Sequence, residues 1–160
     1  MTLSSSPETT MTVSKPKAFC SQSMAARGLS YAHNLVDVAG SPLRIVHRDI
    51  NPHNVLVSYD GEVKIIDFGI AKSELQEGNT ETGTIKGKFN YMSPEQSAAL
   101  KLDNRSDIFT LGICLQELLT NENPFRRSNV VLSLEAIQKE APVRVARRRP
   151  DAGLLQPIVD

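Results

Sequence analysis

The sequence predicts a mainly α-helical domain with one short β-hairpin. Three patterns support this fold class: apolar residues at helical spacing early in the chain, two short apolar runs on either side of Asp60-Gly61, and a long apolar stretch over 107–120. With 160 residues, of which 40% are hydrophobic, the chain can bury one compact core but not two sizeable domains.

The composition of the chain changes at about residue 20. Residues 1–20 are rich in Ser, Thr and Pro and have little to bury, which is typical of a disordered leader. We therefore expect a leader at 1–20 and a folded domain at 21–160. The apolar residues that follow recur at the spacing of one helical face: Ala25, Leu29, Ala32 and Val36. This spacing predicts an amphipathic helix that begins at Ser21.

A loop and a β-hairpin are expected next. Gly40-Ser41-Pro42 is typical of a loop. The apolar runs at 55–57 and 63–66 predict two short strands. Asp60-Gly61 lies between these strands, and this dipeptide favours a type I′ hairpin turn.

Two more helices are expected in the second half of the chain. The stretch 107–120 is apolar on nearly all sides, as is typical of a helix at the centre of a domain. Gly112 lies inside it and costs about 1 kcal/mol of helix stability relative to alanine. A further helix is expected at about 130–139.

Charge and cysteine content exclude several classes of protein. Lys and Arg total 18, as do Asp and Glu, so the net charge is zero and we expect neither a nucleic-acid partner nor a membrane-surface role. Cys20 and Cys114 are far apart and lack metal-ligand spacing, so we expect no disulfide scaffold or zinc site and a reducing, cytoplasmic location. No run reaches the length of a transmembrane helix, and the N-terminus lacks the apolar core of a signal peptide.

Polar motifs lie between these elements in a definite order. His47-Arg48-Asp49 comes first, and Asn54 follows; Asp67-Phe68-Gly69 comes after the second strand, then Ser93-Pro94-Glu95, and Asp107 lies at the start of the buried helix. Each motif alone is weak evidence, since short motifs of this kind also occur in small-molecule phosphotransferases. In this order they resemble the catalytic loop, metal-binding motif, activation segment and central helix of the protein kinase family. The resemblance extends from about residue 21 to the end of the chain.

The resemblance implies a site for phosphoryl transfer from ATP with Mg²⁺. Asp49 would accept and orient the substrate hydroxyl, while Asn54 and Asp67 would hold magnesium against the nucleotide phosphates. Leu56 would lie beneath the adenine ring. The implied substrate is a protein with a serine or threonine acceptor.

Four other residues have structural roles in the family. By resemblance, Asp107 accepts hydrogen bonds from the backbone of the catalytic loop, and His47 and Phe68 stack in the regulatory spine. Glu95 belongs to the motif whose glutamate pairs with a distal arginine in complete kinases. We expect these residues to support the site without contacting substrate.

Two features bear on regulation and on the charge of the site. Arg48 precedes the catalytic aspartate, as in kinases whose activation segment is ordered by phosphorylation, and Thr84 lies where the family's phosphosite usually falls. Most serine/threonine kinases have a lysine at the position of Asn51, and they usually have a threonine at the position of Lys88. We therefore expect Lys88 to supply the missing positive charge from the opposite wall of the site.

The resemblance is to the bacterial, eukaryotic-like (Hanks-type) serine/threonine kinases. Similar loops occur in bacterial members, and Asn51-Pro52-His53 does not resemble the catalytic loop of tyrosine kinases. No glycine-rich loop or strand lysine precedes the catalytic loop, so we expect a C-terminal lobe without the N-terminal lobe, truncated at both ends. Two functions stay open: a serine/threonine kinase that transfers the γ-phosphate of ATP, and an inactive kinase remnant that acts as a binding module.

Overall fold

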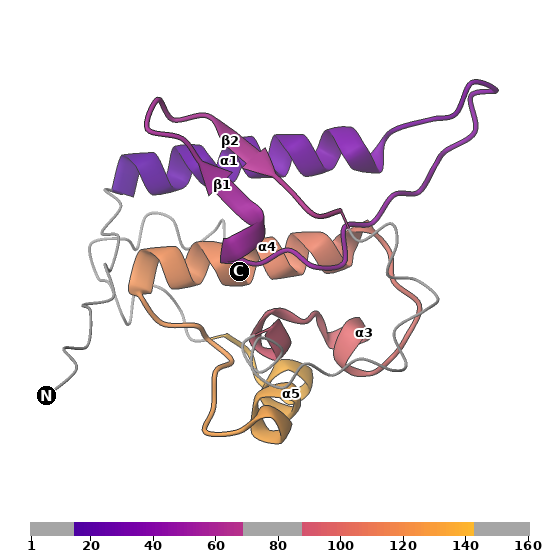
Figure 1. Ribbon diagram of the computed structural model, residues 1–160. Helices are drawn as coiled ribbons and strands as arrows, with labels where there is room; N and C mark the ends of the chain where they lie inside the picture. The colour runs from indigo at the N-terminus through magenta and orange to yellow at the C-terminus, as the bar shows by residue number, and fades with distance from the viewer. Residues whose placement is uncertain (1–14, 69–87, 143–160) are drawn as a thin grey trace, which may run out of the picture.

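The computed structural model describes residues 15–68 and 88–142, and it has the mainly helical architecture that the sequence predicts. The elements in chain order are α1 (Lys15–His33), η1 (Pro52–Asn54), β1 (Val55–Val57), β2 (Val63–Ile65), η3 (Phe89–Tyr91), α3 (Pro94–Ser97), α4 (Asn104–Thr120) and α5 (Val130–Lys139). Helix α4 lies between α1 on one side and α3 with α5 on the other, and the hairpin packs on α1 (Figure 1).

Helix α1 has the expected buried face but different ends. Ala25, Leu29 and Ala32 are buried. The helix begins at Lys15 instead of Ser21, so residues 15–20 of the expected leader are helical, while residues 1–14 lie outside the described part. It ends at His33, so Val36 is not on it: Val36 is 53% exposed and forms an isolated bridge with Pro42.

The side chain of Asp37 explains why the helix does not continue to Val36. Asp37 Oδ1 accepts hydrogen bonds from the backbone N–H groups of Ala39 (2.8 Å) and Ser41 (2.9 Å). Aspartate side chains that bond the local backbone in this way favour turns over helix. Gly40 in the same loop has φ +81°, which glycine adopts at little cost.

The hairpin forms at the expected place, but its turn is of a different type. Strands β1 and β2 are antiparallel, with Val55 opposite Ile65. Ser58 N–H donates to Glu62 O (2.8 Å) and Gly61 N–H to Ser58 O (3.1 Å), so the loop has three residues. A type I′ turn needs positive φ at both central residues, and only Gly61 of Asp60-Gly61 has it (+89°). The type I′ prediction is therefore wrong, because Gly61 closes a three-residue loop.

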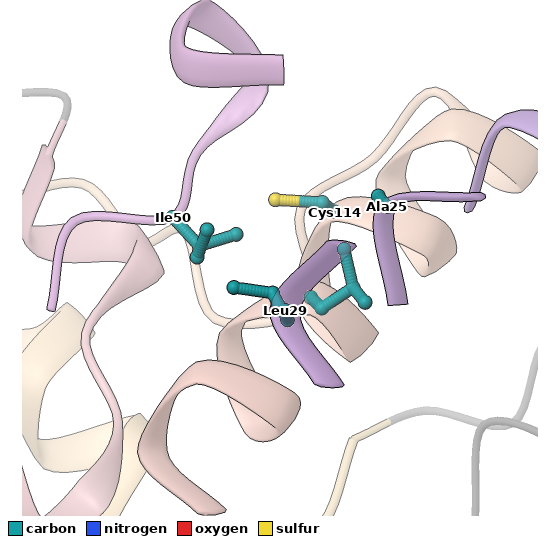
Figure 2. Packing of buried hydrophobic residues seen from close by; sticks show 5 residues of the cluster. Ala25, Leu29, Ile50 and Cys114 are labelled. Carbon is teal, nitrogen blue, oxygen red and sulfur yellow. The ribbon is translucent and has the colours of Figure 1, made fainter. Parts of the chain in front are cut away.

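Helix α4 is the central element, as its apolar sequence predicts. One cluster of buried side chains joins it to α1 and the segment before η1; its members are Ala25, Leu29, Ile50, Leu111 and Cys114. Labelled members of this cluster point toward a common centre (Figure 2). A second cluster joins α4 to α5: Ile113, Phe125, Ala136 and Ile137. The central position of α4 lets it carry polar groups to the site without exposing them to water.

The buried thiol of Cys114 makes stability depend on pH in the alkaline range. Burial raises the pKa of Cys114 from 9.0 to about 12, and the nearby Glu117 carboxylate adds to the shift. The folded-state pKa is above the unfolded one, so this contribution is complete below about pH 9 and is lost as the pH rises toward about 12. We expect the free energy of unfolding to fall over that interval, as measured by urea denaturation followed by circular dichroism.

The matched variant is Cys114→Ala, measured at about pH 8 and about pH 11. Its loss of stability between the two pH values should be smaller than that of the natural chain. Equal losses would show that the Cys114 thiol ionises as readily in the folded chain as in the unfolded one.

Candidate active site

The start of segment 47–54 is hydrogen-bonded to one buried carboxylate, that of Asp107. Asp107, 1% exposed and in the first turn of α4, accepts hydrogen bonds from the backbone N–H groups of His47 (2.7 Å, to Oδ2) and Arg48 (2.9 Å, to Oδ1). Arg48 has φ +68°, an unfavourable conformation for a non-glycine residue. The two hydrogen bonds therefore hold the loop in a shape that it would not adopt by itself.

His33 is a third partner of this carboxylate, and sequence reasoning missed it. His33 Nε2 lies 2.8 Å from Asp107 Oδ2, and both side chains are almost fully buried. His33 comes four residues after Leu29, so it belongs to the buried face of α1. A histidine on a buried helical face needs a polar partner, which is the signal that could have predicted this contact.

Among the described residues, three side chains donate hydrogen bonds to the carboxylate of Asp49. Its Oδ1 accepts from Asn51 Nδ2 (3.1 Å), and its Oδ2 accepts from Asn54 Nδ2 (3.3 Å) and Lys88 Nζ (2.8 Å). Asn51 and Asn54 also donate to the carbonyl oxygen of Asp49, at 3.0 and 2.7 Å. The carboxylate is thus fixed in one orientation before any substrate binds.

Asn51 has a structural role that its place in the motif did not predict. It is 2% exposed and is the N-cap of η1, where its Oδ1 accepts the backbone N–H of His53 at 3.0 Å. The same side chain therefore shapes η1 and orients Asp49. A lysine at this position could not accept that hydrogen bond.

Lys88 reaches Asp49 from a distant part of the chain. It directly precedes η3, and its side chain is 42% exposed whereas that of Asp49 is 16% exposed. A second tether lies beside this ion pair, because Gln96 Nε2 donates to Arg48 O at 2.6 Å. Segment 88–97 is therefore attached to two consecutive residues of the loop.

Segment 88–97 is itself anchored to helix α4. Tyr91 Oη donates to Glu117 Oε2 at 2.5 Å, and burial, followed by this carboxylate, raises the pKa of Tyr91. Ser93 and Gln96 form a reciprocal capping box at the start of α3. The Ser-Pro-Glu-Gln sequence carries this capping signal, although η3 and α3 were not expected.

Asn54 and Asp67 provide oxygen donors suited to a magnesium ion. Asn54 uses its amide nitrogen on Asp49, which leaves its amide oxygen as an acceptor. Ile66 N–H donates to Asn54 O at 3.0 Å. Asp67 is the next residue in the chain after Ile66, and it is exposed and has φ +58°. Among the described residues no three His, Cys, Asp or Glu side chains could form a metal site of their own. An amide and a carboxylate oxygen, completed by phosphate oxygens, fit the hard cation Mg²⁺.

His47 and Phe68 are in contact, and Leu56 is open to solvent. The two rings have centroids 4.5 Å apart and are tilted by 53°. His47 is fully buried, with its Nε2 2.9 Å from Ile66 O. Leu56, in strand β1, is 50% exposed and therefore available for contact with a ligand.

Three further expected residues contribute differently. Glu95 has a buried oxygen, Oε2, that finds no hydrogen-bond partner among the described residues. Arg48 is exposed, and only its backbone carries the contacts described above. Thr84 lies outside the described residues, as does Gly69 of the metal-binding motif.

Comparison with known proteins defines the class of this chain. Residues 3–152 match the protein kinase domain family. The chain therefore belongs to the protein kinase family, and the described residues form a fold like the C-terminal lobe of that domain. The kinase domain of Mycobacterium tuberculosis PknI has the same fold, with a TM-score of 0.61 and 22% identity over 94% of this chain and 47% of that chain.

Within that family, the chain belongs to the bacterial group of eukaryotic-like (Hanks-type) kinases. It is 40% identical over 109 residues to the serine/threonine-protein kinase PknB of Mycolicibacterium smegmatis, and 44% identical over 100 residues to PrkC of Bacillus subtilis. It is 48% identical over 127 residues to a protein titled tyrosine-protein kinase MasK, of Myxococcus xanthus.

The matched regions cover 67% of this chain and 17% of PknB, 62% and 15% for PrkC, and 79% and 20% for MasK. The chain thus spans about a fifth or less of the length of these relatives. Within the described part of the chain, no helix is long and apolar enough to cross a membrane.

Proposed function

We propose that this chain carries the phosphoryl-transfer site of a serine/threonine protein kinase, which moves the γ-phosphate of ATP to a protein hydroxyl. The observation that carries the proposal is the fixed carboxylate of Asp49, held by Asn51, Asn54 and Lys88 at 2.8–3.3 Å. Phosphoryl transfer depends on positioning and electrostatics more than on covalent help from the protein. A carboxylate held in one orientation beside a cation meets that need.

Each group of the site has a role in this proposal. Asp49 accepts the hydrogen bond of the acceptor hydroxyl and takes its proton as transfer proceeds. Asn54 and Asp67 would hold magnesium, whose chemistry is to neutralise charge on the phosphate oxygens. Lys88 adds a second positive charge beside Asp49. In this position its N–H donors would stabilise the negative charge that develops in the transition state. Leu56 offers an apolar surface to the adenine ring.

The acceptor is proposed to be serine or threonine. PknB and PrkC are titled serine/threonine kinases, whereas MasK is titled a tyrosine kinase, so the names of relatives do not agree. The loop Asn51-Pro52-His53 favours the first class, since it does not resemble the loop of tyrosine kinases. Phosphoamino-acid analysis of a protein acceptor decides the question, and phosphotyrosine as the main product would contradict this assignment.

Nucleotide binding gives the first test. We expect the 160-residue chain to bind ATP weakly and more tightly in the presence of magnesium, because the proposed magnesium ligands and one wall of the site lie among the described residues. Calorimetric titration should show that Asp67→Asn removes the magnesium-dependent part of the affinity. Asp60→Asn is the matched control, since Asp60 is an exposed hairpin carboxylate. Tight ATP binding by the chain alone, or equal effects of the two variants, would contradict the expectation.

A binding module is the second candidate function, and one feature favours it. A cavity of about 350 Å³ lies against α1 and β2, with an apolar lining that includes Met24, Tyr31, Leu35, Ile45, Ile65 and Phe68. Leu56 and Val57 are about half exposed on the hairpin. The discriminating measurement is phosphate transfer to a generic protein acceptor by the natural chain and by Asp49→Asn. Phosphate transfer by the natural chain that is lost in Asp49→Asn supports the kinase function. The absence of transfer by both chains favours the binding module.

A further inference from the structure

The ion pair with Lys88 engages the carboxylate of Asp49, which the proposed reaction needs to accept the proton of the acceptor hydroxyl. Lys88 Nζ lies 2.8 Å from Oδ2 of Asp49, and Oδ1 already accepts from Asn51 at 3.1 Å. Both carboxylate oxygens are therefore engaged in the described state. An acceptor hydroxyl must share or displace one of these partners before it can transfer its proton to Asp49.

The pair is suited to exchange because it is only partly buried. The ammonium of Lys88 is on a side chain that is 42% exposed, and an ammonium has three N–H donors, whereas one contact to Asp49 is seen. Partly exposed ion pairs contribute little to folding stability, so breaking this one costs the fold little. The chain that follows Lys88, in contrast, is anchored by hydrogen bonds: Tyr91 is tied to Glu117, and Gln96 to Arg48 O. Only the ammonium has to move.

We propose that the Lys88–Asp49 ion pair is the resting state of the site and that the ammonium passes from Asp49 to the phosphate during transfer. This inference rests on the proposed function. The acceptor O–H bond breaks and its proton goes to Asp49; the acceptor oxygen bonds to the γ-phosphorus; the bond from that phosphorus to the β–γ bridging oxygen breaks, and ADP leaves with the electron pair. Asp49 becomes neutral at this point, so its attraction for Lys88 falls while the negative charge stays on the phosphate oxygens. The ammonium then follows the charge.

The exchange of the Lys88 ammonium has a consequence for polyphosphate binding that can be measured without turnover. In the resting state Asp49 competes with a polyphosphate for the same ammonium. Removing the charge of Asp49 should therefore strengthen polyphosphate binding, but the part of the gain due to this competition exists only while Lys88 is present. A general effect of removing one negative charge would appear with or without Lys88.

The test measures tripolyphosphate binding without magnesium to the 160-residue chain labelled with ¹⁵N-lysine, by NMR of the ammonium signals. Lys88→Arg identifies the Lys88 signal by its loss, and Lys139→Arg, at the exposed C-terminal end of α5, serves as the control. We expect the Lys88 signal to move on titration and Asp49→Asn to raise the affinity about two- to fivefold, as the strength of a partly exposed ion pair implies. In a Lys88→Gln background, read by calorimetry, Asp49→Asn should give no such gain.

The outcomes separate the two proposals. An equal gain in both backgrounds, or a Lys88 signal that does not move at millimolar tripolyphosphate, overturns the exchange of Lys88. Magnesium–ATP is titrated in parallel with Asp67→Asn. If exchange is seen with tripolyphosphate but magnesium–ATP does not bind through Asp67, the proposed nucleotide function fails while the ion-pair exchange stands.

Discussion

Replacing Asp107 with alanine should lower the free energy of unfolding by roughly 1–3 kcal/mol for one buried backbone donor left without a partner, and by a smaller further amount for a second, part-buried donor. Those donors are the N–H groups of His47 and Arg48, at 2.7 and 2.9 Å from the carboxylate. His33 loses its contact as well. Urea denaturation followed by circular dichroism measures the change, since the chain has no tryptophan.

The matched control is Asp103→Ala, which removes a carboxylate that is 48% exposed at the start of the same helix. Asp103 is the N-cap of α4, where its side chain accepts the N–H of Arg105. Loss of an N-cap costs about 1 kcal/mol. If Asp107→Ala costs no more than Asp103→Ala, then the buried carboxylate of Asp107 does not hold segment 47–54 in place.

Replacing Lys88 with alanine should reduce turnover by about 10²–10³, the usual cost of losing one donor directed at transition-state charge. The measurement uses a complete kinase domain that carries asparagine and lysine at the positions of Asn51 and Lys88, with kcat and KM determined separately. We expect the loss in kcat, because the charge acts on the transition state. Lys139→Ala, on the exposed end of α5, provides the control.

A second variant tests whether the cation can return to the loop. Asn51→Lys combined with Lys88→Thr should recover part of the lost turnover. Recovery is expected to be incomplete because Asn51 is buried and caps η1, and a lysine in its place restores a positive charge but cannot accept the backbone N–H of His53. Unchanged kcat in Lys88→Ala would leave Lys88 as a surface charge.

Local patterns predicted most of the fold. The continuous apolar stretch over 107–120 and the short apolar strands depend on neighbours in the sequence, and α4, α5, β1 and β2 lie where they were expected. The errors also have local causes. Asp37 forms a side-chain turn that ends the first helix early, and the sequence pattern did not distinguish a two-residue turn from the three-residue loop closed by Gly61.

Long-range contacts in the site were predictable only where the family resemblance supplied them. The contacts of Asp107 with the loop backbone were anticipated in this way, and Lys88 was expected on the opposite wall of the site, although its contact with Asp49 was not. The His33–Asp107 contact was not, because the place of His33 on the buried face of α1 indicates that it needs a polar partner but does not identify one 74 positions away. The dual role of Asn51 depends on the conformation of η1, which a motif does not encode.

The hydrogen bonds of Asp107 also have a consequence for the order in which the protein folds. Its contacts with His33 and His47 join residues 74 and 60 positions apart, so each closes a long loop of chain. The entropy of loop closure must be overcome before such contacts form, whereas helices and the hairpin need only nearby residues. We expect α1, α4 and the hairpin to gain protection in pulsed hydrogen exchange before the amides of His47 and Arg48 do. The polypeptide would then complete its reactive centre as one of the last events of folding.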